Sequence, residues 1–252
     1  MDGSLSERQK KEEAYHDNIY KNGAEFEVTR IGGGEYYDYF WKAVGDVDGK
    51  NILDFGCGNG WVSIKYAKNG AHVWGFDISG ELIEKAKKWI MKEGLSESIT
   101  LEKMAAENLA YEDNFFDLIV GSAILHHTEL DITLKNIDRV LKPDGKAIFI
   151  EPMNQNIFLQ LWRKMTPNRR SPTERALTKS DLLLIEHVFP RASFTFFGFL
   201  SIFTAGLLVF SPQSRIVATV NNWLDEIDRH IFQFLPFLGR FGAVIVLELK
   251  KG

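Results

Sequence analysis

The sequence has one cysteine, Cys57, among 252 residues and no excess of charge of either sign. A single thiol cannot form an intrachain disulfide or a cysteine-rich zinc site, and it is typical of a reducing compartment, so we expect a cytoplasmic protein. The 30 basic and 34 acidic side chains give a formal net charge of -4. Nucleic acid is therefore not an expected partner, because binding to phosphate depends on many Lys and Arg contacts.

The N-terminal region has no apolar core of the kind found in a secretory signal. Residues 5–21 are polar and helix-favouring, and the triplet Gly32, Gly33 and Gly34 comes after them. Because glycine interrupts helices, this pattern predicts an N-terminal helix carried on a hinge.

From about residue 36, short β-branched runs alternate with amphipathic stretches. Strands are expected over 50–55, 71–76, 98–103, 116–121, 145–150 and 243–250. A further strand, the sixth along the chain, is expected to end at about residue 198. Helices are expected over 36–45, 60–69, 80–93, 106–109, 130–141, 178–186 and 218–235. Residues 152–175 resemble a loop with helical turns. The alternation predicts an α/β, Rossmann-like, seven-stranded doubly wound sheet in a single domain, 1–252.

The segment 51–60, NILDFGCGNG, carries the strongest signal of a binding site. An apolar strand runs into Asp54, and the glycines at 56, 58 and 60 allow the backbone to turn tightly and to approach a ligand. The next strand, VWGF, ends at Asp77, where such sheets place a carboxylate that accepts hydrogen bonds from ribose. The sequence therefore predicts a nucleoside-binding unit.

A dinucleotide site would need G-x-G-x-x-G, and a short-chain dehydrogenase would need a Tyr-x-x-x-Lys pair, which the sequence lacks. DFGCGNG instead resembles motif I of the class I S-adenosylmethionine-dependent methyltransferases, of the methyltransferase type 11 kind. Four more segments resemble later motifs of that family: FDIS at 76–79, AAENL at 105–109, FDLIVGSAILHH at 116–127 and RVLKPDGKAIFIEP at 139–152.

The resemblance implies S-adenosylmethionine as the cofactor, with three parts in the domain: an N-terminal helical lid over 1–35, a cofactor-binding core over 36–151, and an acceptor-side elaboration that completes the sheet over 152–252. Members of the family often carry Asp at the position of Ala105. The cofactor-binding residues that the resemblance implies are Asp54, Gly56, Cys57, Gly58, Gly60, Asp77, Ile78, Ala105, Ala106, Glu107 and Ser122, with Tyr15 and Tyr20 from the N-terminal helix.

Catalytic candidates follow the fourth and fifth strands. His126 and His127 come after the fourth strand, and Glu151 ends the fifth. A histidine is a suitable base for a hydroxyl acceptor, and Glu151 either orients a histidine, binds the substrate or stabilises a turn. No His, Cys or carboxylate group has metal-ligand spacing along the chain, so no metal is expected.

A charge-free stretch, 192–213, includes the hydrophobic residues 194–210. Hydroxyl side chains and glycines dilute this run, and it is at the lower length limit of a membrane span. We expect the sixth strand and then an apolar helix that forms part of an acceptor lid over 199–240. Such a lid implies an apolar acceptor or contact with a membrane surface; packing on the protein's own core is the alternative.

The sequence thus predicts an S-adenosylmethionine-dependent methyltransferase that acts on a small apolar molecule, by O-methylation with histidine assistance. Two alternatives remain open. One is methylation of a protein or peptide, and the other is a non-catalytic S-adenosylmethionine-binding module associated with a membrane.

Overall fold

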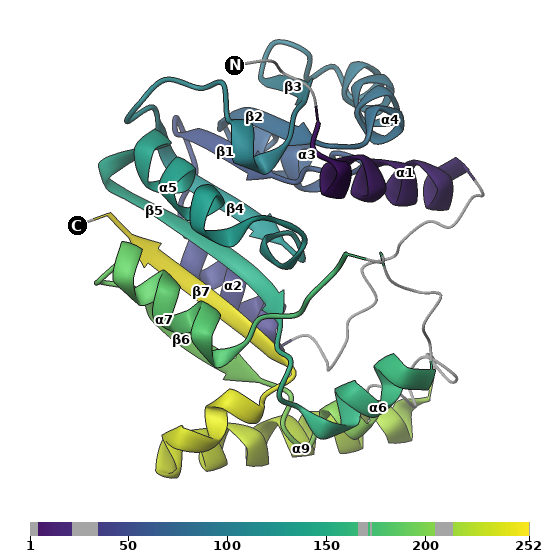
Figure 1. The fold of residues 1–252 in the computed structure, drawn as a ribbon, viewed down its shortest axis with the longest axis vertical. Coiled ribbons are helices and arrows are strands. Elements are labelled where there is room, and N and C mark those ends of the chain that lie inside the picture. Colours follow the sequence, from purple (N-terminus) through teal and green to yellow (C-terminus); the bar gives the residue numbers. More distant parts are fainter. Residues whose placement is uncertain (1–4, 22–34, 166–170, 172, 205–213, 252) are drawn as a thin grey trace.

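A seven-stranded sheet forms the centre of the molecule (Figure 1). The computed structural model describes residues 5–21, 35–165, 171, 173–204 and 214–251. The strand order is β3-β2-β1-β4-β5-β7-β6, with β7 antiparallel to β5 and β6. The strands are β1 (Asn51–Phe55), β2 (His72–Asp77), β3 (Ile99–Lys103), β4 (Phe116–Ser122), β5 (Leu141–Pro152), β6 (Ser193–Phe197) and β7 (Val244–Lys250). The predicted α/β, doubly wound, seven-stranded sheet is confirmed.

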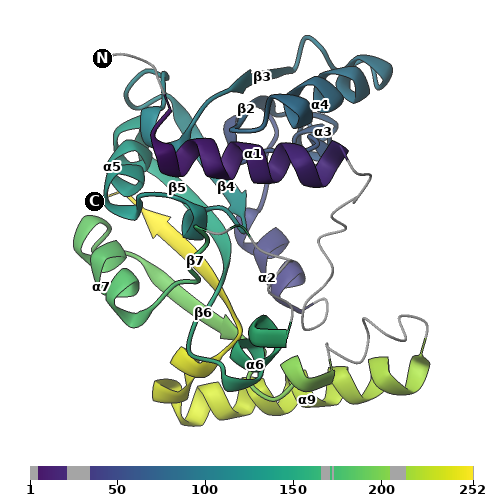
Figure 2. The same cartoon turned by 45° about the vertical axis from the view of Figure 1, so that its right-hand side comes forward.

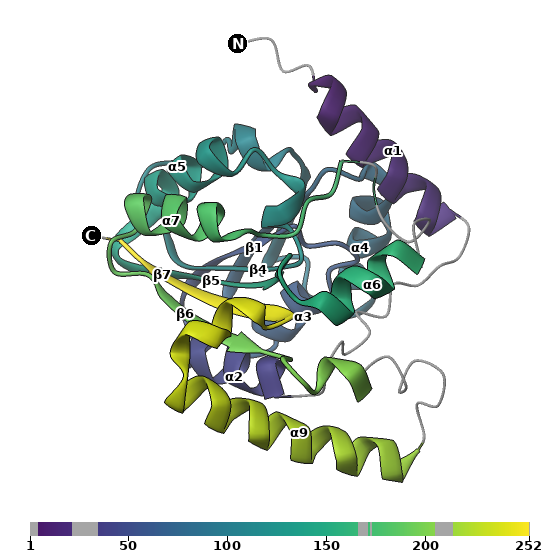
Figure 3. The ribbon, with the colours of Figure 1, turned by 60° about the horizontal axis from the view of Figure 1, so that its bottom comes forward.

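Helices cover both faces of the sheet. Successive strand residues point to opposite faces, so Ile52 packs in one apolar cluster and Leu53 in the other. The first cluster includes residues of α2 (Glu35–Val44), α3 (Trp61–Ala67) and α4 (Gly80–Lys92), and the second includes residues of α5 (Leu130–Val140) and α7 (Lys179–Val188). Figure 3 shows α5 and α7 on the side of the sheet opposite α2.

The strand order creates a switch point between β1 and β4. From β1 the chain moves outward to β2 and β3, then returns to add β4 and β5 on the other side. In open sheets of this kind, ligands bind outside the carboxyl ends of the strands at the switch point. The turn 56–60 after β1 and the short 3-10 helix η2 (Leu125–His127) after β4 therefore lie where a site is expected.

The N-terminal helix α1 (Glu7–Lys21) packs beside α4 and across the carboxyl ends of the strands (Figure 2). Its Asp17 accepts a hydrogen bond from Ser79, just after β2, and its Glu13 pairs with Lys103 at the end of β3. A helix at the predicted position is thus present over the site. The predicted glycine hinge at 32–34 lies outside the described residues.

Two segments of the chain differ from the predicted elements. Residues 152–175 were expected to form a loop with helical turns, and part of them forms a regular helix, α6 (Ile157–Met165). Asn156 caps its start, since Asn156 Oδ1 accepts from the Leu159 backbone N–H at 3.0 Å. Strand β5 begins at Leu141 rather than 145, directly after α5. The pairing of β5 with β4 is irregular between Phe116 and Leu118 of β4. This irregularity accommodates the residues that were expected to connect the helix ending at 141 to the strand starting at 145.

Helix α9 (Arg215–Phe234) is present as predicted, but its apolar residues do not form its buried face. Val220 and Phe234, two of the apolar residues at helical spacing in this segment, are exposed. The buried residues of α9 are Asn221, Asp225 and Asp228. Residues 205–213, which include most of the predicted apolar helix of the lid, lie outside the described residues. No helix in the described parts of the chain is long and apolar enough to cross a bilayer.

Asp228 explains why a polar face is buried. Its carboxylate accepts hydrogen bonds from the backbone N–H groups of residues 199, 200 and 201, at 2.8 to 3.0 Å, and from the Ser201 hydroxyl at 2.9 Å. Asn221 accepts from the Thr204 hydroxyl at 2.6 Å and donates to Asp225 at 2.8 Å. Helix α9 is therefore attached to the segment after β6 by a row of hydrogen bonds.

Replacing Asp228 with Ala is expected to lower the free energy of unfolding by about 2 to 4 kcal/mol, because buried N–H groups would lose a charged acceptor. Urea denaturation measures this change. Glu226→Ala, on the exposed side of the same helix, is the control and should change stability by about 0.5 kcal/mol or less. Equal effects of the two substitutions would contradict the structural role of Asp228.

Candidate active site

The three glycines of the turn after β1 all have a backbone conformation that favours glycine, but the space around them differs. All three have positive φ, at 76° for Gly56, 53° for Gly58 and 80° for Gly60. A Cβ on Gly56 would lie 2.9 Å from the Ile124 side chain, and one on Gly60 would lie 3.0 Å from Ala86 Cβ. A Cβ on Gly58 would meet nothing within 4 Å. The backbone at Gly58 thus faces open space, as close approach of a ligand requires.

Asp77 ties this turn to the next helix. Its Oδ2 accepts from the Gly58 N–H at 3.0 Å, and its Oδ1 accepts from the Ser79 N–H at 2.9 Å. A carboxylate oxygen has two acceptor positions, so each oxygen retains one for a further donor such as a ribose hydroxyl. Ile78, between these contacts, is partly exposed at the same edge of the sheet.

Asp54 comes before the turn, in β1, and Cys57 is part of the turn. Asp54 is buried and accepts from the Ser63 hydroxyl; burial, together with the charge of Asp77, raises the pKa of its carboxyl to about 7. Cys57 is buried, and burial raises the pKa of its thiol well above the usual value. Its backbone N–H donates to the Phe76 carbonyl at 2.8 Å. The thiol is therefore a packing group, and Cys57 acts in the turn through its backbone.

The segment after β3 forms the 3-10 helix η1 (Ala106–Asn108). Ala105 and Ala106 are buried. Glu107 Oε2 accepts from Gln9 Nε2 at 2.8 Å, and its Oε1 accepts from the Glu129 N–H at 2.8 Å and from Arg8. The side chain predicted to contact adenine is thus engaged by α1 and the start of α5, which gives it a structural role.

The other predicted cofactor residues lie near the same edge. Ser122 ends β4 and is partly exposed. The next residue, Ala123, has φ 56°, a left-handed conformation that is rare for a residue with a Cβ and is found most often at functional sites. Tyr15 of α1 is partly buried, with its ring edge-on to His16 at 5.4 Å between centroids. The side chain of Tyr20 lies outside the described residues.

Glu151 organises the turn that carries the two histidines. It is fully buried at the end of β5, and its Oε1 accepts from the backbone N–H groups of Ile124 at 2.9 Å and Leu125 at 2.8 Å. Its Oε2 lies 2.6 Å from His126 Nδ1. An ionised carboxylate only accepts, so Nδ1 carries the hydrogen and Nε2 is the basic nitrogen. Of the three predicted roles of Glu151, the geometry shows that it orients a histidine and stabilises a turn.

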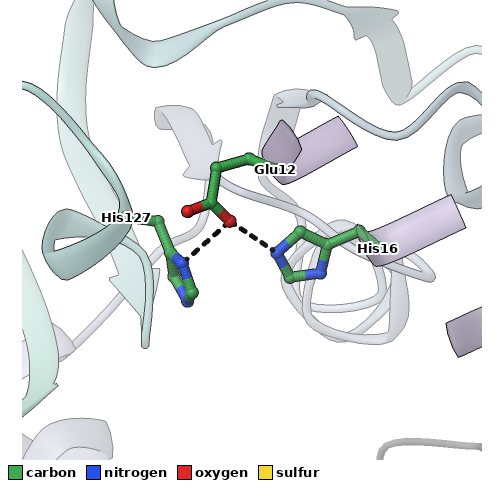
Figure 4. Close-up of side chains that lie close together, drawn as sticks. All are labelled: Glu12, His16 and His127. Carbon is green, nitrogen blue, oxygen red and sulfur yellow. Dashed lines mark ion pairs between the residues drawn. The ribbon is translucent and has the colours of Figure 1, made fainter. Parts of the chain in front are cut away.

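His127 faces α1. Its ring centroid lies 4.1 Å from that of His126, and its Nδ1 lies 3.1 Å from Glu12 Oε2 (Figure 4). Burial raises the pKa of Glu12, whereas the nearby His127 and the hydroxyls of Thr173 and Ser171 lower it, to about 2. Burial and the charge of His127 lower the pKa of His16, one turn further along α1, to about 4.

Sequence spacing did not reveal Glu12, His16 and Glu174 as neighbours of the histidine pair. Glu12, His16 and His127 form one group of side chains able to hold a metal ion, and His126, His127 and Glu174 form a second. Their members come from α1, η2 and the segment after α6, far apart in sequence. The only local signal was the spacing of Glu12 and His16, four residues apart on one helix face.

A doubly wound sheet with a glycine turn and an acid after the second strand defines a nucleoside-binding α/β protein. The family model described as a methyltransferase domain matches residues 53–149. A ubiquinone biosynthesis O-methyltransferase of Actinobacillus pleuropneumoniae (strain L20) is 32% identical over 158 residues, which are 58% of this chain and 67% of that one. The chain belongs to the class I S-adenosylmethionine-dependent methyltransferases, whose cofactor is S-adenosylmethionine.

Two further comparisons concern the sequence and the fold. A demethylmenaquinone methyltransferase of Lactobacillus johnsonii is 34% identical over 138 residues, which are 51% of this chain and 57% of that one. Geranyl diphosphate C-methyltransferase from Streptomyces coelicolor has the same fold, with a TM-score of 0.67 at 10% identity over 98% of this chain and 99% of that one. The chain spans 36% to 67% of the length of the first curated relatives it matches.

Replacing Asp77 with Ala is expected to weaken S-adenosylmethionine binding by about 1.5 to 3 kcal/mol, the scale of hydrogen bonds to a charged group. Calorimetric titration measures the affinity, and circular dichroism checks the fold, because Asp77 also holds Gly58 and Ser79. Asp131→Ala, at an exposed site on α5, is the control. A folded Asp77 variant with unchanged affinity would refute the ribose assignment.

Proposed function

We propose that this protein transfers a methyl group from S-adenosylmethionine to a hydroxyl group of a small apolar molecule. The observation that carries the proposal is the buried pair of Glu151 and His126, beside the open glycine turn. The name of the relative from Actinobacillus, a ubiquinone biosynthesis O-methyltransferase, supports oxygen as the methylated atom.

In the proposed donor site, Gly58 presents backbone to the ligand and Asp77 accepts hydrogen bonds from the ribose hydroxyls. Ala105 and Ala106 provide an apolar wall beside Ile78 for the adenine, and Asp54 supports the turn from below. Bound S-adenosylmethionine supplies an electrophilic methyl group on a positively charged sulfur.

His126 acts as the general base in the proposed reaction. Its Nε2 accepts the proton of the acceptor hydroxyl as the oxygen takes up the methyl group. Glu151 holds the ring in the tautomer with hydrogen on Nδ1 and stabilises the imidazolium that forms. Because Glu151 also accepts from Ile124 and Leu125, the ring and the turn are fixed together.

A mainly apolar pocket at the start of α6 supports a small apolar acceptor over a protein or peptide. Its volume is about 380 Å³. The first residue that lines it, Gln155, follows Glu151 by four positions in the sequence. The lining residues are Gln155, Asn156, Ile157, Phe158, Gln160, Phe199 and Phe241. The polar side chain of Asn156 is already bonded to backbone, with Nδ2 2.8 Å from the Phe241 carbonyl. Ile157 and the three Phe residues provide apolar surface that an acceptor would meet.

Replacing His126 with Gln is expected to lower kcat by about 10²-fold or more with S-adenosylmethionine affinity near wild type, because only the proton acceptor is lost. Glu151→Gln should lower kcat comparably, because an amide does not fix the tautomer. Initial rates with a phenolic quinone precursor and radiolabelled donor, beside calorimetry for donor binding, measure both. Retained rates in both folded variants would rule out His126 as the base.

We further propose that helix α9 rests on a membrane surface. Positions 216, 220, 223, 227, 231 and 234 share one side of the helix and are all apolar. Ile216, Val220, Trp223 and Phe234 are exposed, and α6 beside α9 exposes Leu161 (Figures 1 and 2). The stripe is about 27 Å long at 1.5 Å per residue. A stripe of this length exceeds the size of a small acceptor and suits a lipid surface.

Replacing Trp223 with Glu is expected to lower binding to phosphatidylcholine and phosphatidylglycerol vesicles at least about fivefold, because a charge would enter the apolar layer. Vesicle co-sedimentation measures the bound fraction. Asn222→Glu adds the same charge to the same helix away from the stripe and should have little effect. If the wild-type protein does not sediment with the vesicles, or both variants behave alike, α9 does not contact lipid.

A further inference from the structure

The strongest feature that the proposed reaction does not use lies between α1 and η2. Glu12 and His16 come from α1, and His127 comes from η2; Figure 4 shows the three side chains converging. Glu12 Oε2 is 3.1 Å from His127 Nδ1 and 3.7 Å from His16 Nε2. One ligand atom from each of the three residues lies within 4.8 Å of the others.

Two atoms at the centre of this group lack hydrogen bonds. Glu12 is 3% exposed, and its Oε1 accepts from the Ser171 hydroxyl at 2.7 Å and from Thr173. Within the described residues, neither Glu12 Oε2 nor His127 Nδ1 makes a hydrogen bond, although the two atoms are in contact. A buried carboxylate oxygen without a donor is costly. A cation between the two atoms would satisfy both.

The two distances from Glu12 Oε2 suit a small tetrahedral ion. In a zinc site with ligands at about 2.1 Å in a tetrahedron, neighbouring ligand atoms lie about 3.4 Å apart. The two distances from Glu12 Oε2, 3.1 and 3.7 Å, fall on either side of that value. Two imidazole nitrogens and one carboxylate oxygen are also a ligand set that zinc and similar transition metals prefer, whereas magnesium and calcium prefer oxygen alone.

We propose that Glu12, His16 and His127 bind a divalent transition-metal ion, with Zn²⁺ the best match. The ion has three protein ligands and a fourth position open to water or to an oxygen of a ligand, as in catalytic zinc sites. It joins the N-terminal helix to the turn that carries the histidine pair. The ion thus fastens α1 across the end of the sheet, whether or not His126 acts as a base.

Ser171 and Thr173 hold the carboxylate of Glu12 through the oxygen that does not face the histidines. Their hydroxyls donate to Glu12 Oε1, which turns Oε2 towards the histidines. Oriented carboxylates of this kind raise the affinity of metal sites. The neighbouring group of His126, His127 and Glu174 shares His127, but its Glu174 is paired with Arg163 at 2.5 Å, and its His126 is held by Glu151. The group on α1 is therefore the better site.

To test the proposal, the full chain is first treated with a chelator that removes bound metal. Binding of Zn²⁺ is then measured by calorimetry, and binding of Co²⁺ is measured by visible absorption. We expect one equivalent of either ion and no binding of Mg²⁺. His16→Ala and Glu12→Gln should each lower Zn²⁺ affinity about 100-fold or more. In the Co²⁺ complex, they should also remove the intense visible bands of a tetrahedral site.

A matched control is available on α9. His230 and Glu226 are also four residues apart, with 3.4 Å between Nε2 and Oε1, but both are exposed. His230→Ala should leave the affinity unchanged. Because Glu12 is buried, its variant could unfold; His16 is partly exposed, and His16→Ala then decides the outcome.

Three results would overturn the proposal: no binding of Zn²⁺ by the wild-type chain, unchanged affinity in folded His16→Ala, or an equal loss in His230→Ala. A loss on Glu174→Gln without a loss on His16→Ala would place the ion in the neighbouring group and would equally refute the assignment. None of these measurements uses methyl transfer, so they do not depend on the proposed reaction.

Discussion

The site depends on one buried carboxylate, that of Glu151. It stands at the end of β5, where pairing of Ile150 with Ser122 fixes the end of β4 alongside. From there it bonds two backbone N–H groups of the next turn and the ring of His126. A fully buried charge without these partners would be strongly unfavourable, so the turn, the ring and the strand end have only one satisfactory arrangement. The direction of the histidine pair follows from that arrangement.

Two other carboxylates in the molecule also bind backbone N–H groups of an irregular segment. Asp77 holds the glycine turn and the start of α4 through two backbone N–H groups, and Asp228 holds the segment after β6 through three. In each case a carboxylate on a regular element accepts hydrogen bonds from N–H groups of a turn that have no partner in a helix or strand. The protein thus fixes its irregular segments with polar contacts and leaves the sheet and its two apolar clusters to supply most of the hydrophobic stability.

What the sequence predicted well is local. The glycine turn, the position of Asp77 at the end of the second strand, and the succession of strands and helices along the chain follow from neighbouring residues and hydrophobic periodicity, which act over short spans. The helix α9 was predicted, but the burial of its polar face was not, because its orientation depends on Asp228 meeting N–H groups some 30 residues earlier, a contact with no periodic signal. Asn156 is a residue type that often caps helices, but the sequence pattern around it was not interpreted as the start of α6. The meeting of Glu12 with His127 joins residues 115 positions apart, and no spacing rule reveals such a contact.

The composition of α1 explains why its position matters for the site. Its buried residues Gln9 and Glu12 are polar, so little apolar area holds the helix in place. Its attachments are charged contacts: Arg8 with Glu107, Glu13 with Lys103, and Glu12 with the histidines. The exposed pair of Glu13 with Lys103 contributes about 0 to 1 kcal/mol, whereas the side chains of Glu107 and Glu12 are largely buried and would be left without partners if α1 moved away. The partners of Glu107 and Glu12 therefore contribute most to holding α1 over the carboxyl edge of the sheet.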